Sequence, residues 1–285
     1  MAATTKIKAL LNAGLAKFNF RLETLTADRL EHARLQALSA AGHFAKAVFP
    51  LLPGFENSSA QLVFDNLAQH RARFDTFQEA ARNDVGYAFA NDYFSSPDTE
   101  VLYTLVRLFQ PGRVIEIGSG NSTRITRQAI KDGKLATRLT SIDPFPRREV
   151  ADITDESFRE CVESSGAQAR LRALQSGDFL FIDSSHEVKT GNDVVYLLLN
   201  VLPVLPAGVV IHIHDIFLPY DYPETWAHEW RWNEQYLVQA MLAFGDAFEV
   251  IWPGHYLQRT RSDFAAHFPH LNGRPACSLW LRKVK

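Results

Sequence analysis

The sequence predicts an α/β protein in which a mostly parallel sheet follows a helical region. Residues 1–92 carry apolar side chains at three- and four-residue spacing, which is typical of amphipathic helices. From residue 113 onward, short apolar strands alternate with helical segments, and this pattern is typical of a parallel sheet covered on both faces. We therefore predict two parts, an N-terminal helical region at residues 1–92 and a second domain at residues 93–285.

The composition fits a globular protein rather than a disordered one, since 46% of the 285 residues are apolar and 22% are charged. A net charge of −2 predicts no nucleic-acid partner, because proteins that bind nucleic acids carry a basic surface. Cys161 and Cys277 are far apart and lack CxxC spacing, so we expect neither a disulfide framework nor a zinc site. This cysteine usage leads us to expect a cytoplasmic location.

The helical region opens with a basic amphipathic segment at residues 6–21. Its apolar side chains fall on one helical face, and its charges are all positive. The apolar positions are Ile7, Leu10, Leu11, Leu15 and Phe18, and the basic ones are Lys6, Lys8, Lys17 and Arg21. Two interpretations stay open. The segment packs on the protein itself or on a second subunit of a homodimer, or it lies on a membrane surface.

Two longer helices are predicted at residues 26–49 and 59–82. A further helix is expected to begin at Ser96, with Pro97 in its first position, and to end before Gly112. The apolar faces of the N-terminal helices need burial, so we expect these helices to cover the entrance through which a substrate reaches the second domain, or to form a subunit interface.

Strands and helices alternate through the second domain. The predicted strands are residues 113–118, 139–143, 178–183, 208–215, 248–252 and 278–284. The predicted helices are residues 122–133, 188–202 and 231–244. One more strand is expected between the second and third of these strands, and its candidates are residues 159–164 and residues 169–174.

The first strand ends in the turn Gly118-Ser119-Gly120, which lets a ligand approach the backbone closely. The dinucleotide-binding pattern needs a third glycine, but Thr123 occupies that position. Glu116 places an acid inside the strand, which suits a ligand that carries an ammonium group and presents no pyrophosphate to the turn. A dinucleotide remains the second interpretation of this turn.

The second strand ends at Asp143. An acid at this point can accept hydrogen bonds from both hydroxyls of a ribose, in NAD enzymes and in methyltransferases alike. It therefore predicts an adenosine-type ligand without choosing between these two classes. The alternative is that Asp143 caps the turn that follows the strand.

Four segments carry a family resemblance: "VIEIGSGNST" at 114–123, "SIDPFPR" at 141–147, the run from 177 to 217, and "SLWLRK" at 278–283. Together they resemble the class I S-adenosylmethionine-dependent methyltransferases, and most closely the bacterial methyltransferase domain 24 family. The resemblance covers about residues 93–285. It implies a Rossmann-like, mostly parallel sheet of seven strands with an antiparallel last strand, plus an N-terminal helical appendage.

The resemblance also implies S-adenosyl-L-methionine as the cofactor and a set of contacts to it. Asp143 would hold the ribose. Tyr93 and Phe94 lie in a segment similar to the one that closes over the cofactor in the family. The residues implied for the methionine half are Glu116, Gly118, Gly120, Asn121 and Ser122.

Acids and histidines gather at the ends of two later strands. Asp183 ends one strand, with His186 just beyond it, and His214 and Asp215 end the neighbouring strand. We expect these groups to converge beside the transferable methyl group. There either histidine can act as the base toward the acceptor, and either aspartate can orient it. His212 lies inside its strand and is predicted to be a hydrogen-bonded core residue.

A metal site is a further expectation at these strand ends. Some related O-methyltransferases bind magnesium with acids placed here, and hard divalent cations prefer oxygen ligands. Asp183 and Asp215 are therefore the candidate ligands for Mg²⁺. In the metal-using relatives an Asp or Asn commonly follows the second acid, whereas Ile216 stands at that position here.

We expect methyl transfer to a hydroxyl or an amine of a small metabolite or a glycan precursor. Aromatic side chains beyond Asp215 can stack on a sugar or ring-shaped acceptor, or they can simply be core. They are Tyr220, Tyr222, Trp226, Trp230 and Trp232. The alternatives are an NAD-type Rossmann oxidoreductase and a non-catalytic module that keeps the fold and binds the cofactor.

Overall fold

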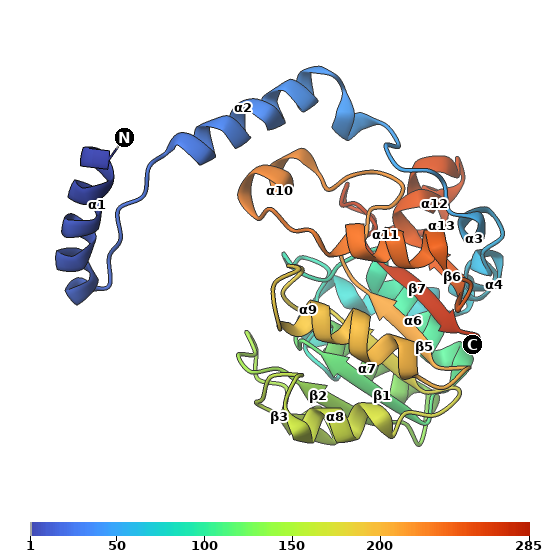
Figure 1. Ribbon diagram of the computed structural model, residues 1–285. Coiled ribbons are helices and arrows are strands. Elements are labelled where there is room, and N and C mark those ends of the chain that lie inside the picture. Colours follow the sequence, from blue (N-terminus) through green and yellow to red (C-terminus); the bar gives the residue numbers. More distant parts are fainter. Residues whose placement is uncertain (1) are drawn as a thin grey trace.

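The computed structural model describes residues 2–285 and contains a seven-stranded sheet in the order β3-β2-β1-β4-β5-β7-β6 (Figure 1). The strands are β1 Arg113–Ile117, β2 Arg138–Ile142, β3 Glu156–Phe158, β4 Phe179–Ile182, β5 Val210–Ile213, β6 Phe248–Pro253 and β7 Leu279–Lys283. The first five strands in space pair in parallel, and β7 pairs antiparallel with both β5 and β6. The predicted fold class, including the antiparallel last strand, is confirmed.

The direction of strand addition reverses at the centre of this sheet. From β1 the chain adds β2 and β3 on one side, and it then returns to add β4 and β5 on the other. In open sheets of this kind, ligands bind beyond the carboxyl ends of the strands at the point of reversal. The carboxyl ends of β1 and β4 therefore mark the place for a site.

Helices cover both faces of the sheet. Val114 and Phe179 point to one face, where α4 (Ala60–Leu67), α6 (Asp98–Phe109) and α7 (Asn121–Gly133) pack. Ile115 and Leu180 point to the other face, where α8 (Ser165–Arg172), α9 (Asp193–Tyr196) and α11 (Glu234–Phe244) pack. This alternation is what buries parallel strands on both sides. The remaining helices of the body are α3 Pro53–Glu56, α5 Arg71–Phe74, α10 Glu224–Glu229, α12 Gly254–Thr260 and α13 Phe264–His267.

The N-terminal 92 residues divide into two parts in space. Helices α1 (Ala2–Leu15) and α2 (Thr26–Ala40) extend away from the body as an arm (Figure 1). Phe64, Phe77 and Tyr87 instead lie in the same core as the sheet. The division of the chain at residue 92 stays a prediction, but residues 60–89 contribute to the core of the body.

Several local predictions were wrong. The third strand is β3, a short and partly exposed edge strand that comes before both predicted candidates; residues 159–164 follow it, and residues 169–174 fall in and just after α8. The predicted helix at 59–82 breaks into short turns after α4. There Phe74 and Phe77 both pack against Tyr103 of α6, so tertiary packing overrides the helical periodicity.

The predicted helix at 188–202 is shorter than expected. Only α9 is α-helical, and it runs on into a wider turn at Leu197–Val201 and a tight turn at Leu202–Val204. Pro203 has no backbone N–H to donate, which ends the regular pattern. Helix α6 likewise begins at Asp98 rather than at Pro97. Among the described residues, no helix combines the length and apolarity needed to cross a membrane.

Candidate active site

The glycine turn holds the carboxyl ends of β1 and β4 together. Gly118 has φ +81°, and a Cβ there would lie 1.8 Å from the backbone oxygen of Asp183, so only glycine fits. Gly120 is different, because a Cβ at that position would meet no atom within 4 Å. The space over Gly120 is therefore open to a ligand, at the edge of the sheet where the cofactor was predicted.

Glu116 is an acid buried inside this edge, with 1% of its surface exposed. Ser122 Oγ donates to Glu116 Oε1, and Glu116 Oε2 has no hydrogen-bond partner within residues 2–285. Burial raises the pKa of Glu116 to about 8, although the Ser122 hydroxyl opposes the shift. A buried carboxyl group with one free oxygen fits an incoming ammonium group.

Asp143 both supports the turn and faces the site. Its Oδ2 accepts hydrogen bonds from Ser119 N at 2.9 Å and Ser119 Oγ at 3.1 Å, and its Oδ1 accepts one from Phe145 N at 2.8 Å. Asp143 therefore does cap the turn that follows β2. Each carboxylate oxygen has more than one lone pair, and the residue is only half-buried, so capacity remains for ribose hydroxyls.

The other predicted cofactor residues lie in two different settings. Asn121 and Ser122 are buried in the first turn of α7, beside the glycine turn. Tyr93 is 60% exposed, and the guanidinium of Arg147 lies 4.8 Å from its ring centroid. Phe94 is buried, with ring centroids 5.9 Å from Phe181 and 5.1 Å from His214. Phe94 thus supports the edge from the core, while Tyr93 stands at its surface.

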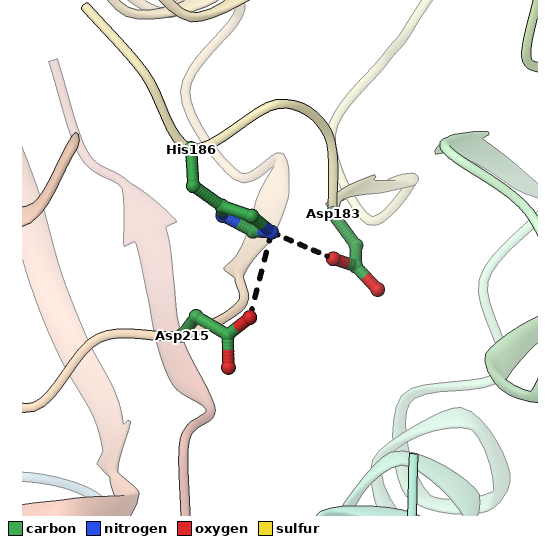
Figure 2. A group of neighbouring side chains, drawn as sticks. All are labelled: Asp183, His186 and Asp215. Carbon is green, nitrogen blue, oxygen red and sulfur yellow. Dashed lines mark ion pairs between the residues drawn. The ribbon is translucent and has the colours of Figure 1, made fainter. Parts of the chain in front are cut away.

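Asp183, His186 and Asp215 converge at the ends of β4 and β5 (Figure 2). His186 Nε2 lies 3.2 Å from Asp183 Oδ1 and 3.4 Å from Asp215 Oδ2. Both His186 and Asp215 adopt left-handed backbone conformations, with φ of +58° and +57°. Such conformations are uncommon for residues other than glycine, and they concentrate at functional sites.

A third carboxyl group, Glu234 at the start of α11, completes the surroundings of His186. Glu234 Oε2 lies 3.0 Å from His186 Nδ1, and the backbone N–H groups of Asn233 and Glu234 donate to the carbonyl oxygen of His186. Glu234 is buried, and the indole of Trp232 packs on the imidazole at 4.3 Å. Nothing in the sequence pattern distinguishes Glu234 from an ordinary acid in a first helical turn, so sequence reasoning missed it.

These contacts set the charge of the cluster. Burial lowers the pKa of His186, but Asp183, Glu234 and Asp215 together raise it well above the usual value. Burial raises the pKa of Asp183, and the neighbouring His214 and His186 more than offset this and lower it below the usual value. The cluster therefore favours a positive charge on His186 beside an ionised Asp183.

His214 and His212 differ although both lie on β5 or at its end. His214 Nε2 is 3.7 Å from Asp215 Oδ1, and its Nδ1 has no partner among the described residues. His212 stacks on Phe181 with ring centroids 3.9 Å apart, and burial lowers its pKa well below the usual value. The core position of His212 is as predicted, but its ring nitrogens make no hydrogen bond within the described chain.

A cavity of about 270 Å³ opens beside His214 and Asp215. This volume is near the lower end of the range for small-molecule sites, roughly 300–1,000 Å³, and suits a single ring-sized group. Trp226 and Trp230 face it with ring centroids 4.6 Å apart, whereas Tyr222 is core. The residues that matter for its chemistry are Tyr93, His214, Asp215, Trp226, Trp230 and Arg274.

Comparison with protein families identifies a methyltransferase domain within the chain. Residues 115–216 match a family model described as a methyltransferase domain. The matched stretch includes Glu116, the glycine turn and Asp215, whereas Glu234 and the cavity tryptophans lie beyond it. The fold and this match together support a class I S-adenosylmethionine-dependent methyltransferase domain in this chain. No curated protein matches the chain.

Solved structures give distant similarities. A candidate O-methyltransferase from Klebsiella pneumoniae is 14% identical, with 87% of this chain and 96% of that chain covered and a TM-score of 0.41. A structure described as cmcI-N160 with SAH is 16% identical, with 71% and 88% covered and a TM-score of 0.40. One described as cmcI-D160 with Mg-SAM is 14% identical, with 70% and 80% covered and a TM-score of 0.40.

Proposed function

We propose that this protein transfers a methyl group from S-adenosyl-L-methionine to a hydroxyl or an amine of a small metabolite or glycan precursor. The observation that carries the proposal is the meeting of three strand ends at one edge. Glu116 on β1, Asp183 after β4 and Asp215 after β5 belong to three neighbouring strands, and Asp215 also lines the cavity space that the two tryptophans face. A methyl donor bound over β1 would present its sulfonium to that space.

The chain's own groups suit the methionine half and the ribose of the donor. Glu116 offers a buried oxygen to the ammonium of the methionine half, and the open space over Gly120 accommodates the backbone of that half. Asp143 offers its carboxylate to the ribose. Tyr93, exposed between Arg147 and the cavity, is placed to close over the methyl group and exclude water.

His214 is the base in this proposal. It lines the cavity, and its buried Nδ1 has no hydrogen-bond partner among the described residues, whereas both ring nitrogens of His186 already face carboxyl groups. The acceptor atom forms a bond to the methyl carbon as the carbon–sulfur bond breaks, and the acceptor proton passes to His214. Asp215 Oδ1 lies 3.7 Å from the other ring nitrogen of His214, and its negative charge would stabilise the imidazolium that results.

Asp183 and Asp215 also fit the predicted divalent cation, because two carboxylates face one point from adjacent strand ends. A cation bound there would lower the pKa of an acceptor hydroxyl. Trp226 and Trp230 would pack on the ring that carries this hydroxyl, in keeping with a sugar-like acceptor.

The test is a screen of monosaccharides, glycan precursors and small phenols and amines for S-adenosylhomocysteine formation. We expect turnover with at least one hydroxyl or amine acceptor, and loss of that turnover in Asp215→Asn. If S-adenosylmethionine binds but no acceptor across the panel is methylated, the non-catalytic binding module becomes the better account. If S-adenosylmethionine does not bind, the proposed function is wrong.

A further inference from the structure

His186 is held in a way that the base mechanism does not use. Its Nε2 faces Asp183 and Asp215 (Figure 2). Its Nδ1 faces Glu234. The imidazole is buried and clamped by the indole of Trp232. His186 does not line the cavity that would hold the acceptor, and both of its ring nitrogens already face carboxyl groups. We therefore look for a role other than proton transfer.

The distances around His186 Nε2 are those of ligand atoms that share one ion. Two ligand atoms that each lie about 2.1 Å from a metal are separated by about 3.0–3.4 Å when the angle between them is about 90–109°. His186 Nε2 is 3.2 Å from Asp183 Oδ1 and 3.4 Å from Asp215 Oδ2. One oxygen or nitrogen atom from each of the three residues lies within 4.8 Å of the others. Small adjustments would therefore let one ion replace the proton on Nε2.

Glu234 supplies the partner that a metal-bound imidazole needs. A ligating histidine almost always donates its other N–H to a carboxylate or carbonyl, which fixes the ring and strengthens the ligand. Glu234 Oε2 is 3.0 Å from His186 Nδ1, and the backbone of the same residue donates to the His186 carbonyl. Both the ring and the backbone of His186 are thus oriented by one residue.

We propose that Asp183, His186 and Asp215 bind a first-row transition-metal ion, that Mn²⁺ and Zn²⁺ bind there more tightly than Mg²⁺, and that Glu234 is the positioning residue for His186. The identity of the ion follows from the third ligand. Carboxylates and water suit Mg²⁺, but an imidazole nitrogen suits Mn²⁺, Fe²⁺ and Zn²⁺ and adds little for Mg²⁺. The position that follows Asp215 is Ile216, so no further oxygen ligand is available from that residue.

Only the catalytic role of the ion rests on the proposed function. Binding of the ion does not, because it can be measured without turnover. Calorimetric titrations of the full chain, freed of metal by a chelator, with MgCl₂, MnCl₂ and ZnCl₂ would test it. We expect affinity to rise from Mg²⁺ to Mn²⁺ to Zn²⁺, with Mn²⁺ bound at least about tenfold more tightly than Mg²⁺. Titration with S-adenosylhomocysteine in the same series keeps the two proposals separate.

Variants locate the ion. Asp183→Asn should lose binding of all three ions, and His186→Gln should lose the preference for Mn²⁺ and Zn²⁺ over Mg²⁺. Glu234→Ala should weaken Mn²⁺ by about 10- to 100-fold, and Glu234→Gln, which keeps an acceptor for Nδ1–H, should recover part of this loss. His43→Gln is the matched control, since His43 also pairs with an aspartate, Asp221, at 2.8 Å but lies outside the cluster.

Circular dichroism and S-adenosylhomocysteine binding would show that each variant is folded. Equal affinities for Mg²⁺ and Mn²⁺ in the parent protein would overturn the proposal, as would an unchanged preference in His186→Gln. If no ion binds while S-adenosylhomocysteine does, the cluster is an ion pair around a protonated His186, and the proposed methyl transfer stands without a metal.

Discussion

The N-terminal arm and the cluster of Asp183, His186, Asp215 and Glu234 differ in which side chains they expose to water. The arm, α1 and α2, leaves apolar side chains in water: Leu10 is 78% exposed and Phe18 is 73% exposed. The cluster instead takes charged groups out of water, with His186 and Glu234 at 5% and 1% exposure. Exposed apolar surface and buried charge each cost free energy unless something compensates.

The difference lies in where that compensation comes from. In the cluster the chain itself supplies opposite charges at hydrogen-bonding distance, so the burial is balanced and the groups are held ready for ligands. In the described part of the arm, Leu35 of α2 is buried, but most of the other apolar side chains remain exposed. We therefore expect changes at the cluster and the cofactor edge to damage binding and turnover, and changes in the arm to leave both nearly intact.

The largest effect is expected when the whole N-terminal helical region is removed. A chain that begins at Asn91 loses Phe64, Phe77 and Tyr87 from the core, and each lost aromatic costs about 3–5 kcal/mol, so it should aggregate. A chain that lacks only residues 1–40 should fold, because Leu35 is the one buried side chain among the described side chains of this segment. Size-exclusion chromatography and circular dichroism separate the outcomes, and a stable, fully active chain from Asn91 onward would refute the assignment of this core.

The next largest effect is expected at the proposed base. His214→Ala should reduce turnover by about 10²- to 10⁴-fold while the affinity for S-adenosylmethionine is nearly kept, because the residue acts on the acceptor. The turnover of His186→Ala should be measured in parallel, with and without EDTA. This comparison distinguishes the loss of a base from the loss of a bound ion. If both variants turn over at the rate of the parent protein, a histidine is not the base.

A smaller effect is expected at the ribose contact. Asp143→Ala should weaken S-adenosylmethionine by about 2 kcal/mol, roughly 30-fold, since hydrogen bonds to a charged acceptor are lost. The same change removes the contacts to Ser119 and Phe145, so the melting temperature should fall as well. Unchanged affinity in a folded variant would remove Asp143 from the ribose site.

Glu116 should link cofactor binding and stability to pH. Burial raises its pKa from the usual 4.5 to about 8, so the folded protein keeps a proton that the unfolded chain has lost between these pH values. The free energy of unfolding should therefore fall as pH rises through this window, and Glu116→Gln should lessen that fall. Binding of an ammonium group favours the ionised acid, so S-adenosylmethionine should release a proton at pH 7 in the parent only. Calorimetry in buffers of different ionisation enthalpy measures that proton, and identical values in both proteins would contradict the role of Glu116.

The smallest effect is expected in the arm. Removal of residues 1–25 should leave S-adenosylmethionine affinity nearly unchanged and alter the free energy of unfolding by about 0.5 kcal/mol or less, because none of the described side chains of this segment is buried. Its consequence should appear in association instead, as a change in apparent mass or in binding to anionic vesicles. A loss of cofactor affinity would show that the arm reaches the site.

The site was more predictable than several of the elements that carry it. Asp183 and Asp215 end continuous apolar strands, and parallel strands bring their carboxyl ends to one edge, so their convergence followed from pattern alone. Glu234 could not be predicted, because its contact with His186 joins segments 48 residues apart through a helix start. β3 has too few buried residues to show a strand pattern. The conformation of residues 59–82 is set by packing of their aromatic side chains in the core, and not by their helical periodicity.

The central claim is that this edge binds S-adenosylmethionine, and calorimetry with the full chain tests it most directly. Titrations with S-adenosylmethionine, S-adenosylhomocysteine and NAD under the same conditions should show saturable binding of the first two and none of NAD. Asp143→Ala and Glu116→Gln should each weaken the first two. Tight binding of NAD, or no binding of either methionine-derived ligand to the folded protein, would contradict the account.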